Sequence, residues 1–256
     1  MIYLTGDTHQ DFRRFNTDNF PEQKHMSKDD YVIICGDFGG IWSVDPNNRF
    51  ETYWLNWLEA KPFTTLFIDG NHENFDRLNA FPIEMWNGGK IHRIRPHILH
   101  LMRGQIFTLE DRTFFTFGGA ASHDIEDGIL DPGDPKIKEY KRLYLHHRIQ
   151  KQYRIRNVSW WEAELPSSSE MEEGLSNLEQ HQHKVDYILT HTPCTSILKQ
   201  MDGGYGAYQA NVLTDYLQKI KQTTDFHQWI FGHMHTNQMF YWDRCVCIYE
   251  QISRLL

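Results

Sequence analysis

Short apolar runs recur along the chain, and each of them ends in Gly, Asp, Asn or His. The clearest are IYLTGD (2–7), YVIICGD (31–37), TTLFIDGNH (64–72) and VDYILTH (185–191). These runs are nearly continuous rather than alternating in hydrophobicity, which is typical of strands buried on both faces of a parallel sheet. The pattern therefore predicts an α/β protein with several parallel strands.

A helical pattern lies between the second and third runs. Phe50, Trp54, Trp57 and Leu58 share one face at helical spacing within residues 49–61, which predicts an amphipathic helix. Between the first two runs, the segment DFRRFNTDNF predicts a weaker helix.

Two later segments have the pattern of hairpins. Residues 105–120 are expected to turn at Glu110-Asp111, and residues 238–251 at Asp243-Arg244. Parallel units combined with hairpins indicate two facing sheets with helices outside, which is a layered sandwich.

Residues 125–183 interrupt this pattern. The segment is polar, contains Pro and Gly, and continues into a basic helical stretch; helix starts are predicted at Ser159 and at Ser167–Ser169. Strand-like sequence resumes at Val185. We therefore predict an inserted helical cap within one domain that spans residues 1–256.

Composition narrows the class of protein. A chain of 256 residues with 40% hydrophobic residues fits one large α/β domain. The net charge of −8 argues against a general nucleic-acid-binding surface and leaves room only for a local basic patch. No apolar run approaches the ~20 residues that cross a bilayer, and no cleavable leader precedes the first run. The four cysteines contain no CxxC pair. We expect a cytoplasmic protein with reduced thiols and no membrane partner.

The polar residues that follow the apolar runs carry the candidate chemistry. They are Asp7 and His9, Asp37, Asn71 and His72, His191, and finally His233 and His235. In open α/β sheets, ligands bind outside the carboxyl ends of the strands. Carboxylate, amide and imidazole groups gathered there suit Mn, Fe or Zn rather than a thiolate site. Taken singly, each residue could equally serve a turn or a helix cap, but five such coincidences favour a metal site.

These residues also resemble the five blocks of the calcineurin-like metallophosphoesterase superfamily. The blocks are Asp7-x-His9, Gly36-Asp37, Gly70-Asn71-His72-Glu73, Thr190-His191 and Gly232-His233-x-His235, in the order found in that superfamily. The segment from GGA-S-D to SWW and VDYILTH resembles a bacterial and phage-associated branch of it.

The resemblance implies a four-layer α/β/β/α sandwich of two facing mixed sheets, and a site for two divalent metal ions. Mn²⁺ is expected first, with Fe, Zn or Ni as alternatives. One ion would be held by Asp7, His9, Asp37 and His235, and the other by Asp37, Asn71, His191 and His233, so that Asp37 bridges them. Such a pair lowers the pKa of a bridging water enough to provide a hydroxide nucleophile. His72 would protonate the leaving group or stabilise its charge.

One block departs from the common pattern of the superfamily. Many members read GDxxD, where the second Asp orients the histidine, and an Arg often follows. Here Gly40 and Ile41 occupy these positions, which argues against protein phosphatase activity. Gly39 and Gly40 are expected to serve the turn.

Substrate contacts are predicted less directly. Ser122, His123 and Asp124 follow a strand, and Arg154 or Arg156 could reach from the cap to bind phosphate. Each could instead be an ordinary turn or surface residue. Trp160 and Trp161 could stack on a base or sugar, although packing is expected for at least one of them.

The sequence therefore predicts a phosphoesterase that hydrolyses small phosphomonoesters or phosphodiesters, nucleotides among them, as its small-molecule partners. A nuclease acting on DNA or RNA is the alternative; the acidic net charge opposes it, and residues 136–156 are the basic stretch that could support it. A non-catalytic metal-binding scaffold would be expected to lack ligands, and the sequence lacks none of those implied.

Overall fold

The two predicted sheets face one another in the computed structural model, which describes residues 1–203, 205–206 and 208–255. The seven-stranded sheet has the order β15-β1-β2-β3-β6-β5-β4 and the six-stranded sheet the order β13-β14-β12-β11-β8-β7. In the first, β1, β2, β3 and β6 are parallel. In the second, β8, β11, β12 and β14 are parallel. Antiparallel strands complete both sheets, so both are mixed.

The strands of the first sheet are β1 (Ile2–Thr5), β2 (Tyr31–Cys35), β3 (Thr64–Ile68), β4 (Ile83–Trp86), β5 (Gly89–Arg95), β6 (Ile98–Leu101) and β15 (Ser253–Arg254). Those of the second are β7 (Gln105–Leu109), β8 (Arg112–Phe117), β11 (Lys184–Thr190), β12 (Asp225–Phe231), β13 (Gln238–Phe240) and β14 (Cys245–Cys247). The strands β9 (Ile129–Leu130) and β10 (Arg154–Ile155) form a separate pair. Both predicted hairpins are confirmed, as β7–β8 and β13–β14.

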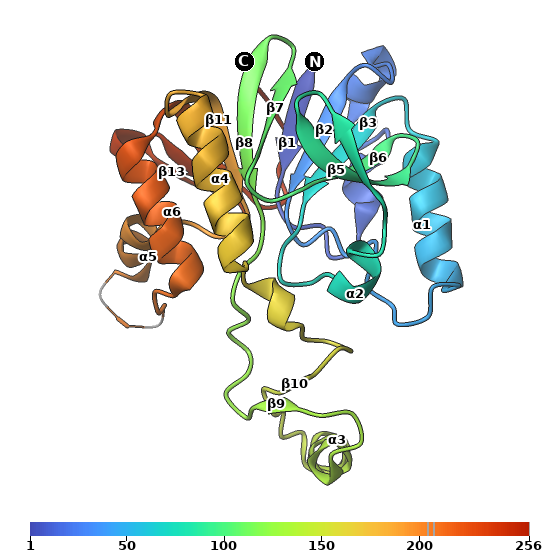
Figure 1. Cartoon of the computed structure of the whole chain (residues 1–256). Coiled ribbons are helices and arrows are strands. Elements are labelled where there is room, and N and C mark those ends of the chain that lie inside the picture. The colour runs from blue at the N-terminus through green and yellow to red at the C-terminus, as the bar shows by residue number, and fades with distance from the viewer. Residues whose placement is uncertain (204, 207, 256) are drawn as a thin grey trace.

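The described residues form six α-helices. They are α1 (Arg49–Glu59), α2 (Phe75–Leu78), α3 (Pro135–His147), α4 (Ser168–Gln180), α5 (Thr195–Asp202) and α6 (Val212–Thr223). Short 3₁₀ segments are η1 (Phe12–Phe15), η2 (Pro21–His25), η3 (Glu162–Glu164) and η4 (Tyr241–Asp243). In Figure 1, α4, α5 and α6 lie outside one sheet and α1 outside the other.

Three hydrophobic clusters fill the spaces between these layers. Ile33 and Leu66 of the first sheet meet Leu189 of the second in the central cluster. Val32 and Leu58 belong to the cluster beneath α1. A third cluster joins the second sheet to α4 and α6. Because successive residues of a strand face opposite sides, the nearly continuous apolar runs supply two clusters each. The four-layer α/β/β/α sandwich is confirmed.

Three local predictions were wrong. Residues 11–20 form the 3₁₀ segment η1 and a turn rather than a helix. In α1 the buried face contains Glu51 instead of Phe50, because the Glu51 carboxylate accepts hydrogen bonds from the amides of Trp42 and Ser43. Around Ser159 the chain forms a bridge and then η3, whereas the start at Ser167 is confirmed by a capping box at α4.

Residues 125–183 contain two different kinds of structure. In Figure 1, α3, β9 and β10 project from one end of the sandwich, and every residue of α3 is exposed or half-buried. By contrast, α4 buries Gly174 and Leu178 in the layer over the second sheet. The division of the chain into a domain and a cap stays a prediction.

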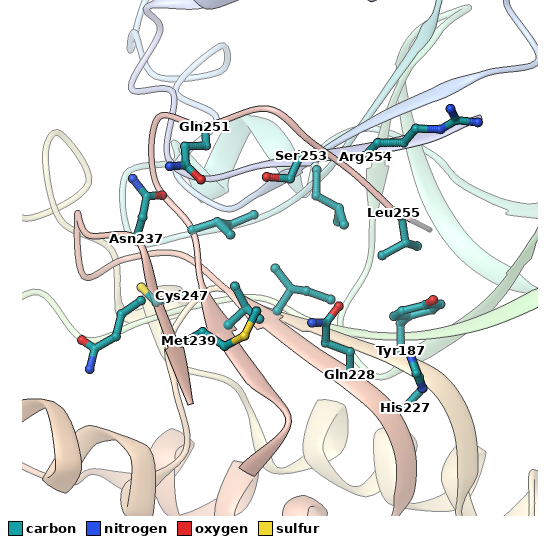
Figure 2. Close-up of a pocket in the computed structure, with 15 residues that line it drawn as sticks. Tyr187, His227, Gln228, Asn237, Met239, Cys247, Gln251, Ser253, Arg254 and Leu255 are labelled. Carbon is teal, nitrogen blue, oxygen red and sulfur yellow. The ribbon is translucent and has the colours of Figure 1, made fainter. Parts of the chain in front are cut away.

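A cavity of about 560 Å³ opens where the C-terminal tail meets the second sheet. Figure 2 shows Leu255 and Ser253 on one side of it and Tyr187 and Gln228 on another. None of the described residues that line it is a predicted site residue. Within the described part of the chain, no helix combines the length and apolar character needed to cross a bilayer.

Candidate metal centre

The predicted metal ligands come together where β1, β2, β3, β11 and β12 end. Two groups of donor atoms form, within each of which all atoms lie within 4.8 Å of one another: Asp7, His9, Asp37 and His235, and then Asp37, His191 and His233. The arrangement matches the two predicted ligand sets, apart from the amide of Asn71.

Asp37 belongs to both groups, and its two carboxylate oxygens are divided between them. Oδ2 lies 3.6 Å from Nε2 of His9, and Oδ1 lies 3.3 Å from Nε2 of His191. Oδ1 also accepts a hydrogen bond of 2.8 Å from the amide of His72. A carboxylate held in this way can contribute one oxygen to each of two neighbouring cations.

The first group is crowded by imidazole nitrogens. Nε2 of His9 lies 3.0 Å from Nε2 of His235, which is itself 3.0 Å from Oδ2 of Asp7. The other oxygen of Asp7 accepts from the amide of His233 at 2.9 Å. One hydrogen at most can lie between two imidazole nitrogens, whereas a cation satisfies both lone pairs together with the carboxylate.

Three buried polar atoms at this place make no well-oriented hydrogen bond among the described residues, although two of them have a polar neighbour within 3.3 Å. They are Oδ2 of Asp7, Oδ1 of Asn71 and Nε2 of His191. The amide nitrogen of Asn71 donates to Oγ of Ser122 at 3.4 Å, so its oxygen remains as a donor for a cation. Burial of unpaired polar atoms is costly, and metal ligation would satisfy all three. The residues therefore fit a pair of divalent ions.

Backbone strain gathers at the same residues. His9, Asp37, His233 and His235 have φ angles of 44°, 46°, 65° and 47°. Left-handed conformations are uncommon for residues other than glycine and cluster at functional sites. The surrounding turns hold these side chains in directions that an extended strand would not give them.

Glycines before the ligands permit the loops to approach one another. A Cβ atom at Gly70 would lie 2.0 Å from Oδ1 of Asp37, and one at Gly36 would lie 2.0 Å from Nδ1 of His191. Each glycine therefore makes room for a ligand that comes from a different strand.

The electrostatics of the centre demand positive charge. Burial alone would raise the pKa of Asp37, but His191, His72 and His9 hold that pKa well below its usual range. Burial alone would lower the pKa of His191, yet the carboxylates of Asp37 and Asp7 raise it to about 10. Burial lowers the pKa of His233 to about 3. In the absence of metal, a proton on His191 thus offsets the carboxylates.

His72 lies beside the centre but outside both ligand groups. Its ring makes an edge contact with His9, with centroids 4.9 Å apart, and lies 5.5 Å from the ring of Trp42. Burial lowers the pKa of His72 to about 4. The next residue, Glu73, accepts hydrogen bonds from the amides of Phe38 and Gly39 and so fixes the loop that carries Asp37.

The structure brings the predicted substrate residues to the edge of the centre. Ser122 contacts Asn71, and the ring of His123 packs against His233 with centroids 5.7 Å apart. Asp124 forms an ion pair with Arg154, whose Nη2 lies 3.4 Å from Nε2 of His72. Their role in binding substrate stays a prediction.

The other cap residues lie differently. Arg156 forms an exposed ion pair with Asp131 and lies over the ring of Trp160. Trp161 is buried and donates from Nε1 to Asp76 at 2.9 Å. The expectation of packing for at least one tryptophan is therefore confirmed by Trp161.

Sequence reasoning missed several residues around the centre. A cavity of about 460 Å³ has His233 and His235 in its wall together with Tyr208 and Asn211. The ring of Tyr249 stacks on His235 with centroids 4.6 Å apart. Tyr208, Asn211 and Tyr249 lie outside the recognisable blocks, so no local pattern indicated them. Glu73 was named within the block Gly70-Asn71-His72-Glu73, but no role was assigned to it.

Several known proteins are similar to this chain. Two curated relatives are each named lariat debranching enzyme. The Caenorhabditis elegans protein is 26% identical over 204 residues, which cover 74% of this chain and 36% of the relative. The Caenorhabditis briggsae protein is 28% identical over 149 residues, which cover 54% of this chain and 26% of the relative. The chain thus spans about a third of the length of these relatives or less.

A solved structure, phosphopantetheinyl hydrolase from Mycobacterium tuberculosis, aligns with a TM-score of 0.42 and 13% identity, covering 97% of this chain and 87% of that chain. The narrower resemblance to a bacterial and phage-associated branch stays a prediction. The sequence model described as calcineurin-like phosphoesterase matches residues 1–237. The chain therefore belongs to the calcineurin-like phosphoesterase family.

Proposed function

We propose that the protein is a metal-dependent hydrolase of small phosphomonoesters or phosphodiesters, with nucleotides among the substrates. The observation that supports this most is the division of the two Asp37 oxygens between two ligand groups. When bound, two divalent ions, Mn²⁺ first among them, supply Lewis acidity that activates a water molecule and offsets the charge of the phosphoryl group.

The residues of the chain have separate tasks in this proposal. Asp37 holds the two ligand groups together. His72 lies beside them, in contact with the ring of His9 and close to Arg154, where an N–H of its neutral ring stabilises the charge on the leaving oxygen. The organic part of the substrate occupies the cavity of about 460 Å³ beside His233, which is of the size that holds small ligands.

The test compares His72→Ala with the exposed control His25→Ala. After loading with Mn²⁺, both variants should contain two ions per chain. We expect kcat on an alkyl phosphate to fall about 10²- to 10⁴-fold in His72→Ala only. Wild-type kcat in His72→Ala would refute the role of His72.

A nuclease is the second candidate. The relatives' printed name, lariat debranching enzyme, and the basic residues Lys138, Lys141 and Arg142 on the exposed α3 favour it. A panel of 4-nitrophenyl phosphate, bis(4-nitrophenyl) phosphate, nucleotides and oligonucleotides separates the candidates by kcat/KM. Higher kcat/KM on oligonucleotides would favour the nuclease, and hydrolysis of none of them by the fully loaded protein would favour a non-catalytic scaffold.

A further inference from the structure

In many members of the superfamily, an aspartate at the position of Gly40 orients the histidine that corresponds to His72. In this protein there is no room for a side chain at that position. A Cβ atom at Gly40 would lie 2.3 Å from Cε1 of Phe38. The Phe38 ring cannot give way easily, because it is fully buried and stacked on Phe67 with centroids 4.1 Å apart. An aspartate at position 40 is therefore excluded by packing, and groups beside His72 must come from elsewhere in the chain.

The projecting segment supplies such a group in Arg154. The short strand β10 pairs with β9, and the amide of Arg154 donates to the carbonyl of Gly128 at 3.2 Å. Nε and Nη2 of Arg154 donate to the two oxygens of Asp124 at 2.9 and 2.6 Å. The Arg154 side chain is 16% exposed, compared with 46% for Arg156 two residues later. Asp124 thus holds the guanidinium in a fixed orientation at the edge of the centre.

Arg154 contacts His72 through one of its guanidinium nitrogens. Guanidinium nitrogens can only donate, so Nη2, 3.4 Å from Nε2 of His72, presents an N–H towards a ring nitrogen that accepts. Nη1 of Arg154 has no hydrogen-bond partner among the residues that the structure describes. The guanidinium of Arg154 therefore keeps N–H donors available after it has bound Asp124. These donors lie beside His72, which follows the candidate ligand Asn71 in the sequence.

We infer that Arg154 is a phosphate-binding residue: its free N–H groups donate to a non-bridging oxygen of the phosphoryl group held at the metal centre, while Asp124 fixes the guanidinium beside His72. The inference rests on the proposed function for the identity of the substrate. In many members of the family an arginine follows the second block, where this chain has Ile41. In this protein, Arg154 of the projecting segment would take the place of that arginine.

The test is binding of inorganic phosphate to the Mn²⁺-loaded protein, measured by titration calorimetry. The variants are Arg154→Gln, Arg154→Lys and the matched control Arg156→Gln, which lies on the same segment. We expect Arg154→Gln to bind phosphate about 10- to 100-fold more weakly than wild type. The phosphate affinity of Arg154→Lys should lie between those of wild type and Arg154→Gln, because an ammonium keeps the charge and loses the paired donors. Arg156→Gln should stay within about twofold of wild type, since its ion pair is exposed.

Other measurements separate phosphate binding from a structural role. All variants should keep two ions per chain and the wild-type melting temperature within a few degrees. Arg154→Gln should raise KM for the best substrate of the panel. Equal phosphate affinity in Arg154→Gln and Arg156→Gln would overturn the inference. Failure of the wild type to bind phosphate would also overturn it. The same holds if Arg154→Gln binds phosphate more weakly only because it has lost metal. Arg154-dependent phosphate binding without hydrolysis by wild type would uphold the inference and overturn the proposed function.

Discussion

Nδ1 of His191 lies 2.8 Å from the carbonyl oxygen of Cys35. A carbonyl can only accept, so Nδ1 carries a hydrogen and Nε2 is directed towards Asp37. Hydrogen bonds of this kind fix the tautomer and the orientation of metal-ligating histidines. The carbonyl of Cys35 at the end of β2 thus orients His191, the candidate ligand that follows β11.

This geometry predicts that His191 serves only one of the two metal positions. His191→Ala should reduce the bound Mn²⁺ from two ions per chain to one, because Asp7, His9, Asp37 and His235 are left intact. Metal content measured by mass spectrometry after gel filtration checks this. Two retained ions would show that His191 is not a ligand.

The buried ion pair of Arg103 and Asp69 should be important for stability. Nε and Nη2 of Arg103 donate to Oδ2 of Asp69 at 2.9 and 2.6 Å, and Nη2 also donates to the carbonyl of Ala163 at 2.8 Å. Both side chains are at most 5% exposed. Arg103→Met would leave the Asp69 carboxylate with the imidazole of His100, 3.1 Å away, as its remaining side-chain partner.

We expect Arg103→Met to lower the free energy of unfolding by about 3–5 kcal/mol, because a buried charge loses its partner. Urea denaturation of metal-free protein measures this without interference from bound ions. The control Arg156→Met breaks an exposed pair and should cost less than about 1 kcal/mol. Equal decreases in the free energy of unfolding of the two variants would show that the buried ion pair contributes no more to stability than the exposed one.

Glu164 should make stability depend on pH. Burial raises its pKa to about 8 from the ordinary 4.5, and Oε2 accepts a hydrogen bond from the amide of Ser122. Between these two pKa values the folded protein holds a proton that the unfolded chain has released. The stabilisation is therefore complete below pH 4.5 and is lost as the pH rises to about 8.

Glu164→Gln cannot ionise and should not show this loss. Relative to wild type, the free energy of unfolding of the variant should rise by up to about 1.4 kcal/mol per pH unit across this window. Denaturant unfolding at pH 5.5, 7 and 8.5 provides the comparison. A difference between the two proteins that is the same at all three pH values would contradict the assignment.

The sequence predicted the sandwich and the candidate metal site because both depend on local patterns. Buried strands have continuous apolar runs, and the candidate ligands lie within a few residues of the ends of these runs, as Asp37 does after β2. Contacts between distant segments leave no such pattern. Only the structure shows the ion pair of Asp124 with Arg154 and the stacking of Tyr249 on His235. It also shows that Phe38 leaves no room for a side chain at Gly40. Phe50 was wrongly predicted on the buried face of α1, because the burial of Glu51 in its place depends on amide partners in a neighbouring loop.

The shared role of Asp37 is the central claim, and metal counting on Asp37→Ala tests it most directly. Wild type and the exposed control Asp18→Ala should each retain two Mn²⁺ ions per chain after gel filtration. If the Asp37 carboxylate bridges both positions, Asp37→Ala should weaken both and retain fewer ions than His191→Ala, which spares the first position. Two ions retained by Asp37→Ala would contradict the account.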